Sequence, residues 1–305
     1  MLNVALLKPT SALAPEISAL HHYLSQKPGF ESRIVSEAKG SLDRSVDVLY
    51  RMVGFSPPWS DIGLREFHDY ASLSTGSWPH WKNAVKRMLN KEPIARTFLN
   101  QYVRKGMGFT DSVPWAYRDM GVPETFLEGR RDFLGAPEAY DHDLVYVGTM
   151  ADARDVGQLV GGAVGNGLRI LLVGEPSVSL LETYGGNPLV QFTGRLDQSD
   201  VLLACRTAYA GASHVPSIYP FTFQTATKVL EYCAIGLPVF SNRTQWATDF
   251  SLLNGPGVSV VENWSQLTRD ELVTRATVPS LHGVNTWFDV FEEAGIAQMI
   301  ERALT

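Results

Sequence analysis

The sequence predicts an α/β protein of two doubly wound domains, each a parallel sheet with helices on its faces. Short apolar runs alternate with longer helical patterns along the chain, as they do in βαβ units. A stretch rich in glycine, proline and charge interrupts this alternation near the middle. The chain has 305 residues, 45% of them apolar, which is enough for two modest cores.

The first half alternates between strands and helices. Strands are expected at 3–7, 32–36, 46–53, 64–68 and 95–100. Helices are expected at 12–25, 81–89 and 101–108, and the second of these carries basic residues on its outer side. The possible strand at 64–68 is expected to end in His68-Asp69-Tyr70, which places two titratable groups, His68 and Asp69, at a strand terminus.

The interruption in the middle of the chain is bracketed by two turn-forming triplets. These triplets, Gly121-Val122-Pro123 and Gly135-Ala136-Pro137, enclose a charged stretch at 124–132 that is typical of an interdomain linker. We therefore expect a first domain at 1–125, a linker at 126–142, a second domain at 143–285 and a final segment at 286–305.

The second half repeats the alternation with cleaner strands. They are expected at 144–147, 169–173, 190–193, 208–212, 238–241 and 258–261. Apolar residues recur at helical spacing over 286–304, which predicts a final helix. Two such domains are expected to face each other across a cleft, and ligands of these sheets bind at the carboxyl ends of the strands.

Composition narrows the class of protein. The chain start has too short an apolar run for a signal peptide, and no later run approaches the ~18 apolar residues of a membrane span. Cys205 and Cys233 lack the spacing of a zinc or redox site and are expected to be buried thiols in a reducing compartment. We expect a cytoplasmic protein with no nucleic-acid partner.

The densest chemical information lies at 220–242. A loop with three threonines, Thr222, Thr225 and Thr227, leads into a short helix expected to begin near Thr225 and to end at Gly236. A helix start favours phosphate through its free N–H groups and its positive dipole end. Lys228 adds a positive charge for a diphosphate in the first turn, where lysine is otherwise unfavourable. Glu231, one turn later, is suited to two vicinal ribose hydroxyls.

From Lys228 onward the sequence reads K-x-x-E-Y-x-A-x-G-L-P-V, which resembles the donor-site helix and strand of GT-B glycosyltransferases of the family-4-like (group 1) type. Further likenesses are VYVGT at 145–149, ILLVG at 170–174 and VQFTG at 190–194, which resemble the first three strand ends of the donor domain. FHDYAS at 67–72 resembles a strand end beside the transferred sugar. The ending at 286–305 resembles the helix that crosses back to the first domain.

The resemblance implies a fold and a set of site residues. The fold is GT-B, with two Rossmann-like doubly wound domains. Gly148, Thr149 and Arg154 would lie across the donor phosphates, and His68 or Asp69 would act as a base toward the acceptor. Family 4 has two glutamates separated by seven residues, but Phe223 stands where the first is expected. Thr222 or Gln224 would then replace it, and the stereochemical outcome stays open.

The function that this resemblance implies is a hexosyl-type glycosyltransferase for polysaccharide or glycolipid synthesis. It would move a sugar from a nucleotide-diphosphate donor to a glycan or lipid-linked acceptor, and cationic side chains would do the work of a metal, so that no cofactor is required. Two alternatives remain: a sugar-nucleotide epimerase of similar fold, and a degenerate protein that binds a sugar nucleotide without turning it over.

Simpler interpretations apply to several of these residues. Lys228 and Glu231 are spaced as an ordinary i,i+3 ion pair, and His68 and Asp69 could cap a loop. Three tryptophans near the basic helix are more often core residues than an acceptor platform; they are Trp59, Trp78 and Trp81. The first 125 residues contain 15 Lys and Arg against 12 Asp and Glu, and the rest 11 against 20, which leaves open peripheral attachment to the inner face of a membrane.

Overall fold

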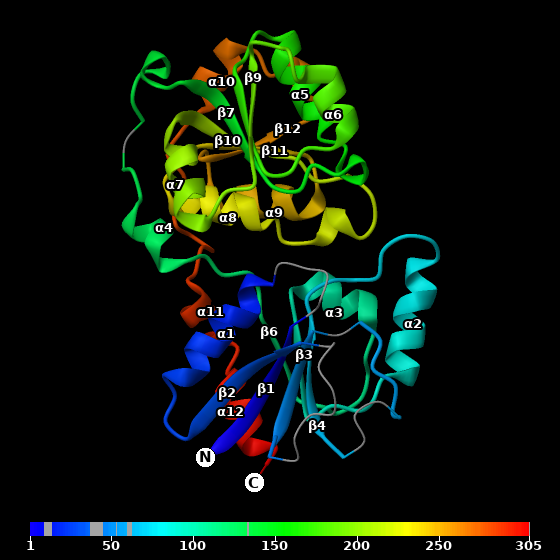
Figure 1. The fold of residues 1–305 in the computed structure, drawn as a ribbon. Helices are drawn as coiled ribbons and strands as arrows, with labels where there is room; N and C mark the ends of the chain where they lie inside the picture. The colour runs from blue at the N-terminus through cyan, green and yellow to red at the C-terminus, as the bar shows by residue number, and fades with distance from the viewer. Residues whose placement is uncertain (9–13, 37–44, 53, 60–62, 133, 305) are drawn as a thin grey trace. The chain divides into compact units, whose positions relative to one another are not determined.

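The computed structural model describes residues 1–8, 14–36, 45–52, 54–59, 63–132 and 134–304. The chain forms two compact units. Unit 1 comprises Met1–Gly121 and Asn285–Thr305, and unit 2 comprises Val122–Val284. Each unit contains one six-stranded parallel sheet flanked by helices (Figure 1). The predicted class, two doubly wound α/β domains, is confirmed.

Unit 1 has the strand order β2-β1-β3-β4-β5-β6, with every neighbouring pair parallel. Its strands are β1 (Leu2–Lys8), β2 (Phe30–Ser36), β3 (Val48–Met52), β4 (Arg65–Tyr70), β5 (Ala95–Phe98) and β6 (Trp115–Tyr117). Its helices are α1 (Pro15–Ser25), α2 (Pro79–Leu89), α3 (Gln101–Met107), α11 (Trp287–Glu293) and α12 (Ile296–Arg302).

One face of the unit 1 sheet packs against α1 and the two C-terminal helices. Val4, Leu6 and Val48 of the sheet share a buried cluster with Phe291 and Ile300 of those helices. The expected final helix is therefore two helices, because Gly295 takes a left-handed conformation (φ 62°) between them. The first of the two begins with a capping box, in which Thr286 and Asp289 satisfy each other's backbone N–H.

Unit 2 has the strand order β12-β11-β10-β7-β8-β9, again all parallel. Its strands are β7 (His142–Val147), β8 (Ile170–Val173), β9 (Val190–Gly194), β10 (Ala208–Ser213), β11 (Val239–Asn242) and β12 (Val258–Val261). Its α-helices are α4 (Glu124–Glu128), α5 (Gly157–Gly165), α6 (Val178–Tyr184), α7 (Gln198–Arg206), α8 (Thr227–Ala234), α9 (Gln245–Asn254) and α10 (Arg269–Arg275). Short 3-10 turns are η1 (Pro137–Ala139), η2 (Asp152–Arg154), η3 (Phe221–Phe223) and η4 (Trp264–Gln266).

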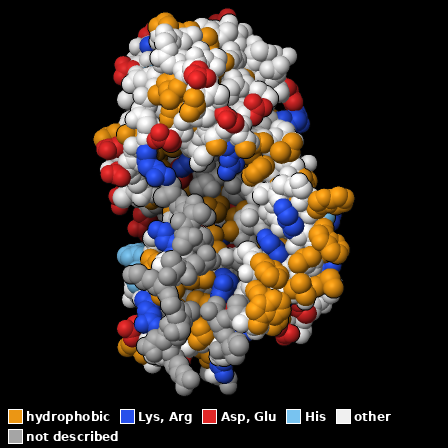
Figure 2. All heavy atoms as spheres, turned by 45° about the vertical axis from the view of Figure 1, so that its right-hand side comes forward, with side chains coloured by type: hydrophobic (Ala, Val, Ile, Leu, Met, Phe, Trp, Pro, Cys, Tyr) orange, Lys and Arg blue, Asp and Glu red, His pale blue; other side chains and the backbone are white. Residues whose placement is uncertain are grey.

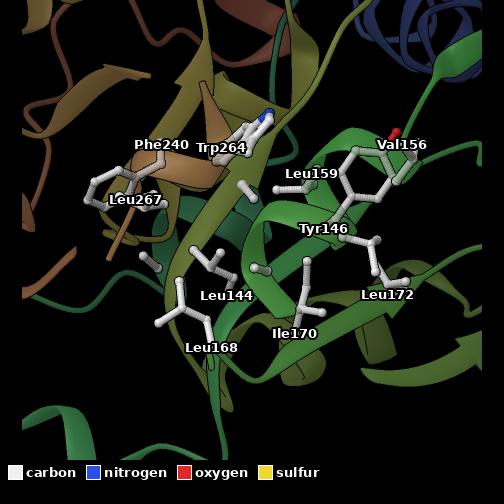
Figure 3. Close-up of a cluster of buried hydrophobic side chains, with 14 of the residues drawn as sticks. Leu144, Tyr146, Val156, Leu159, Leu168, Ile170, Leu172, Phe240, Trp264 and Leu267 are labelled. Carbon is white, nitrogen blue, oxygen red and sulfur yellow. The ribbon is translucent and has the colours of Figure 1, made fainter. Parts of the chain in front are cut away.

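The core of unit 2 follows from the alternation of side chains along its strands. Leu144, Ile170 and Leu172 point to the face covered by α5, where Leu159 and Trp264 meet them (Figure 3). Residues on the other face of the sheet meet α7 and α8. As expected, Cys205 and Cys233 are buried there as free thiols.

The stretch expected to be an interdomain linker belongs to unit 2. It carries α4 and η1, and two of its arginines bond to the end of α8 and to β10. Arg130 donates to the carbonyl of Cys233 (2.5 Å), and Arg131 donates to those of Tyr209 (2.9 Å) and Gly236 (3.2 Å). Cations at a helix C-terminus satisfy its last carbonyls and its dipole, which explains why a charged stretch packs rather than links.

The described part of the chain has no helix that is both long and apolar enough to cross a membrane.

Candidate functional site

The strand order of unit 2 defines where a ligand is expected. From β7 the chain adds strands outward on one side of the sheet, to β9. It then returns to the other side of β7 and adds β10 to β12 outward there, so the order in which strands are added reverses between β7 and β10. In open α/β sheets the crevice at the carboxyl ends of the strands on either side of this switch point takes the ligand. The loops that follow β7 and β10 therefore form the candidate site.

Glycines allow the strand ends beside the switch point to approach closely. The Gly148 N–H donates to Val173 (2.9 Å), and the Gly174 N–H donates to Gly194 (2.9 Å), which joins the ends of β7, β8 and β9. A Cβ atom on Gly174 would lie 2.1 Å from the Gly148 carbonyl oxygen. Only glycine therefore fits at 174. The glycines that end the VYVG and ILLVG strands occur together because the two strand ends pack against each other.

The two loops that flank the switch point contact each other. The Arg154 guanidinium carbon lies 5.0 Å from the centre of the Phe221 ring, so the loop after β7 meets the segment that precedes α8. His214, at the end of β10, accepts a hydrogen bond from the Trp264 indole (2.9 Å) and contacts the backbone of Asp155. Burial lowers the pKa of His214, although Asp155 partly opposes this, and the imidazole is neutral near pH 7.

The N-cap residue of helix α8, Ala226, makes no side-chain cap hydrogen bond. The first turn of the helix holds no acidic residue. Lys228 occupies that turn and is the sole lysine of unit 2. Its Nζ lies 2.6 Å from Oε2 of Glu231, and the two side chains are 36% and 14% exposed. The i,i+3 ion pair is thus formed, and the lysine side chain remains partly exposed.

Contacts of Tyr232 with the sheet and a glycine after its last turn fix the position of α8. Tyr232 is buried against Gly211 of β10, where a Cβ atom would lie 2.5 Å from the tyrosine ring. The Tyr232 hydroxyl accepts a hydrogen bond from the Val147 N–H (3.0 Å). Gly236 (φ 74°) then ends the helix in a Schellman motif, in which its own N–H bonds to Cys233 (3.1 Å) and the next N–H to Tyr232 (2.9 Å). These contacts fix the second half and the end of α8 against the sheet.

The other expected donor residues fall into two groups. Thr222 has a structural contact, since its hydroxyl accepts the Gln245 N–H (3.1 Å) at the start of α9. Thr225 is buried, which leaves little of its side chain for a ligand. Thr149 is exposed and its carbonyl is held by Tyr146, while Gln224 and Thr227 are half-buried near the helix start. The structure thus gathers Arg154, Gln224, Thr227, Lys228 and Glu231 in the two loops and the first turns of α8.

One residue that shapes this site was missed from the sequence. Asn242, at the end of β11, exchanges two hydrogen bonds of 2.8 Å with the backbone of Val215 and donates to Ser217 (3.2 Å). It therefore anchors the beginning of the loop that leads to Phe221 and α8. An asparagine directly after a buried strand was the available signal, because its side chain can mimic a backbone partner.

In unit 1, the structure places His68 and Asp69 inside the sheet rather than at its edge. Strand β4 continues to Tyr70, so both side chains are 1% exposed or less. Asp69 accepts from Arg118 (2.5 Å) and from Thr97 (3.0 Å). Burial alone would lower the pKa of Arg118. The charge of the Asp69 carboxylate has the opposite and larger effect, so the pKa of Arg118 is above its usual value. In this geometry neither expected base is accessible to an acceptor.

His68 belongs to a second buried network on the opposite face of the sheet. Its Nε2 lies 2.7 Å from Glu66, which also accepts from the Ser56 hydroxyl (2.9 Å). Burial lowers the pKa of His68, so the imidazole is neutral and donates to the carboxylate. Burial raises the pKa of Glu66, but the hydrogen bond from His68 and the charge of Arg51 bring it below its usual value.

A carboxylate that the sequence did not single out lies near Arg118. Glu16, in the first turn of α1, is half-buried, and burial raises its pKa although the charge of Arg118 opposes the shift. A partly exposed carboxylate with a raised pKa has the properties of a general base or acid. Among the described residues there is no group of three side chains suited to bind a metal ion.

Known structures resemble the whole chain, although neither a protein-family model nor a curated protein matches its sequence. AviGT4, a glycosyltransferase involved in avilamycin A biosynthesis, is 16% identical, with a TM-score of 0.64 over 100% of this chain and 98% of its own. Sucrose-phosphate synthase from Thermosynechococcus elongatus is 13% identical, with a TM-score of 0.67 over all of both chains.

An epimerase is similar as well. UDP-GlcNAc 2-epimerase from Methanocaldococcus jannaschii is 8% identical, with a TM-score of 0.55 over 97% of this chain and 99% of its own. At such low identity these likenesses establish the fold, while membership of family 4 within it stays a prediction. The chain has the GT-B fold, with two Rossmann-like domains.

Proposed function

We propose that the chain is a glycosyltransferase whose unit 2 binds a nucleotide-diphosphate sugar at the start of α8. The observation that carries the proposal is the meeting of the two switch-point loops through Arg154 and Phe221, shortly before a helix start whose N-cap is Ala226 and whose first turn bears Lys228. A helix start with a lysine in its first turn, preceded by a segment that an arginine contacts, favours a diphosphate.

The ion pair of Lys228 with Glu231 gives the site two states. Without ligand, the carboxylate holds the ammonium at 2.6 Å. A diphosphate would compete for Lys228 and leave Glu231 free to accept from the two ribose hydroxyls. Lys228 and Arg154 would then stabilise the charge that grows on the diphosphate as the sugar leaves, which is electrostatic catalysis by preorganised groups.

The acceptor side of the reaction needs a base that a hydroxyl can reach. Asp69 and His68 are enclosed, so we propose Glu16 in their place, because it is half-buried and its pKa is raised. Turnover would then rise with pH through an apparent pKa above the usual value of a glutamate. Glu16→Gln should remove that rise while donor binding stays unchanged.

The test is a panel of UDP-, GDP-, ADP- and dTDP-sugars, preceded by melting curves with the corresponding diphosphates. Binding of one diphosphate should raise the melting temperature by several degrees. The transferase should then release that diphosphate, slowly to water and faster with a glycan or glycolipid acceptor. Binding without any release would show a degenerate binding protein, and the absence of binding to every diphosphate would refute the proposal.

The epimerase is retained as a second candidate because a 2-epimerase shares the fold. An epimerase converts its sugar nucleotide with no acceptor present, and the product is an isomeric sugar nucleotide. Chromatography of the reaction without acceptor therefore separates the two candidates.

A further inference from the structure

Helix α2 of unit 1 has an unusual orientation, because its polar side faces the protein. The buried residue of the helix is Asn83 (1% exposed), whose Oδ1 accepts the Ser74 N–H (2.9 Å). Arg87 donates to the last carbonyls of α3, those of Met107 (3.3 Å) and Gly108 (3.4 Å). Polar contacts thus attach α2, whereas a helix on a globular protein ordinarily buries its apolar stripe.

The apolar side of α2 faces outward and is continuous with neighbouring apolar residues. Trp81 (68% exposed) and Met88 (75%) lie on one side of the helix, and Trp78 (79%) stands at its N-cap in a left-handed conformation (φ 57°) that L-residues seldom adopt. Phe55 (50%) and Trp59 (68%) add to the exposed set. The expectation that the three tryptophans are core residues is therefore wrong.

Positive charge lies beside these apolar side chains, on the polar side of the helix. Lys82, Lys86 and Arg87 lie on the helix, which contains no acidic residue, although the chain as a whole has a formal net charge of −6. Figure 2 shows hydrophobic side chains gathered with Lys and Arg on the face of unit 1 that carries α2. Burial, together with the charge of Lys82, lowers the pKa of Lys86.

A groove of about 550 Å³ lies alongside the helix. It is lined by apolar Phe55, Leu73 and Trp81 and by Lys82 and Lys86. Apolar residues and two lysines in one groove suit a ligand that has an acyl part and a phosphate head group.

We infer that α2, with Phe55 and Trp78, docks unit 1 onto the surface of a bilayer that contains anionic lipid. A helix of this kind lies in the plane of the interface, with aromatic rings at the level of the head groups and lysines on the phosphates. A second copy of the chain fits less well, because a symmetric contact would bring Lys82 and Lys86 of both copies together. The inference does not depend on the reaction proposed above.

The test is sedimentation of the full chain with vesicles of phosphatidylcholine, with and without phosphatidylglycerol. We expect binding to the anionic vesicles, little binding to the neutral ones, and release by salt. Lys82→Gln with Lys86→Gln should weaken binding about fivefold for each lysine. Trp81→Ser with Met88→Ser should weaken it at least about tenfold.

A matched control removes an equally exposed apolar pair from unit 2. Leu252 and Leu253 are 80% and 64% exposed on α9, and serines there should leave vesicle binding unchanged. All three double variants should melt as the parent does, because the replaced side chains contribute little to the core. Fluorescence quenching of the parent by brominated lipid provides a readout that needs no variant.

Four results would overturn the inference: equal binding to neutral and anionic vesicles, full binding by the α2 variants, equal loss in the α9 control, or no quenching. Absence of vesicle binding, together with a dimer in lipid-free solution that the Trp81/Met88 variant abolishes, would assign the surface to a second copy instead.

Discussion

The two units share an architecture but place their charged groups differently. In unit 1, the middle strand β4 carries Glu66, His68 and Asp69 within the sheet, each 1% exposed or less and each paired. In unit 2, a buried carboxylate, Asp143, lies at the beginning of β7 and pairs with Arg169 and Arg269. The charged residues of the candidate site, Arg154 and Lys228, stand instead in a loop and a helix start. The titratable residues expected on the acceptor side are therefore enclosed in the sheet of unit 1, whereas the cations expected on the donor side of unit 2 lie outside its sheet, where a ligand can use them.

The largest expected effect comes from breaking the buried pair of unit 1. Asp69→Asn leaves the Arg118 guanidinium enclosed without its counter-charge, which should cost about 3–5 kcal/mol of unfolding free energy. Urea denaturation measures this loss. Lys228→Met breaks the exposed pair of unit 2 and should cost less than about 1 kcal/mol. Similar losses for both variants would contradict the comparison.

The next effect tests the rigid end of α8. Gly236→Ala adds a Cβ that would lie 2.0 Å from the Arg131 carbonyl oxygen, in a left-handed conformation (φ 74°), and should cost about 2–4 kcal/mol. The control is Gly165→Ala in α5, where the new methyl group meets nothing within 4 Å. That change should be neutral or stabilise the protein by up to about 1 kcal/mol. Equal melting temperatures for the two variants would show that α8 is not fixed in this way.

Acid should destabilise both units through one buried histidine each. Burial lowers the pKa of His68 and of His214, so as the pH falls the unfolded chain takes up their protons first. Stability should decline below about pH 6.5, by at most about 1.4 kcal/mol per pH unit and histidine. Unit 1 should lose more at lower pH, because the pKa of Glu66 is also lowered.

Unfolding free energies measured across this pH range check the decline. His68→Gln and His214→Gln should each flatten it. A slope that neither variant changes would rule out these histidines as its source.

A smaller effect on binding affinity tests whether Glu231 binds a ribose or serves only as the ion-pair partner of Lys228. Glu231→Gln frees Lys228 for phosphate but weakens the acceptor for ribose hydroxyls. The affinity for a nucleoside diphosphate relative to pyrophosphate should therefore fall about fivefold, by isothermal titration calorimetry. An unchanged ratio would mean that the carboxylate serves only as the partner of Lys228.

Sequence patterns predicted unit 2 better than unit 1, for physical reasons. Its strands are apolar runs bounded by glycine turns, and Gly236 ends α8 where expected, because a left-handed position there requires glycine. The strand expected at 64–68 ends too early, because polar residues are typical of strand ends. In the structure, pairing of β4 with β5 continues to Tyr70. Polar groups inside a sheet depend on partners from distant strands, such as Arg118, which periodicity does not reveal.

The surface of α2 shows a related limit. The apolar stripe of the helix is visible in the sequence, but the stripe alone does not say which side faces the protein. That choice depends on Asn83 and Arg87 finding partners at Ser74 and in α3. Likewise, Arg154 was identified from its place after the first glycine turn, whereas its contact with Phe221 depends on the fold.

The central claim is that Lys228, at the start of α8, binds the diphosphate of a sugar nucleotide. Calorimetric titration of Lys228→Ala with the nucleoside diphosphate that the parent binds tests it most directly. The variant should bind at least about tenfold more weakly, since a hydrogen bond to a charged group contributes about 1.5–3 kcal/mol. Affinity for the nucleoside alone should not change. Lys105→Ala, which removes an exposed lysine of α3 in unit 1, should bind as the parent does. Undiminished diphosphate binding by Lys228→Ala would contradict the account.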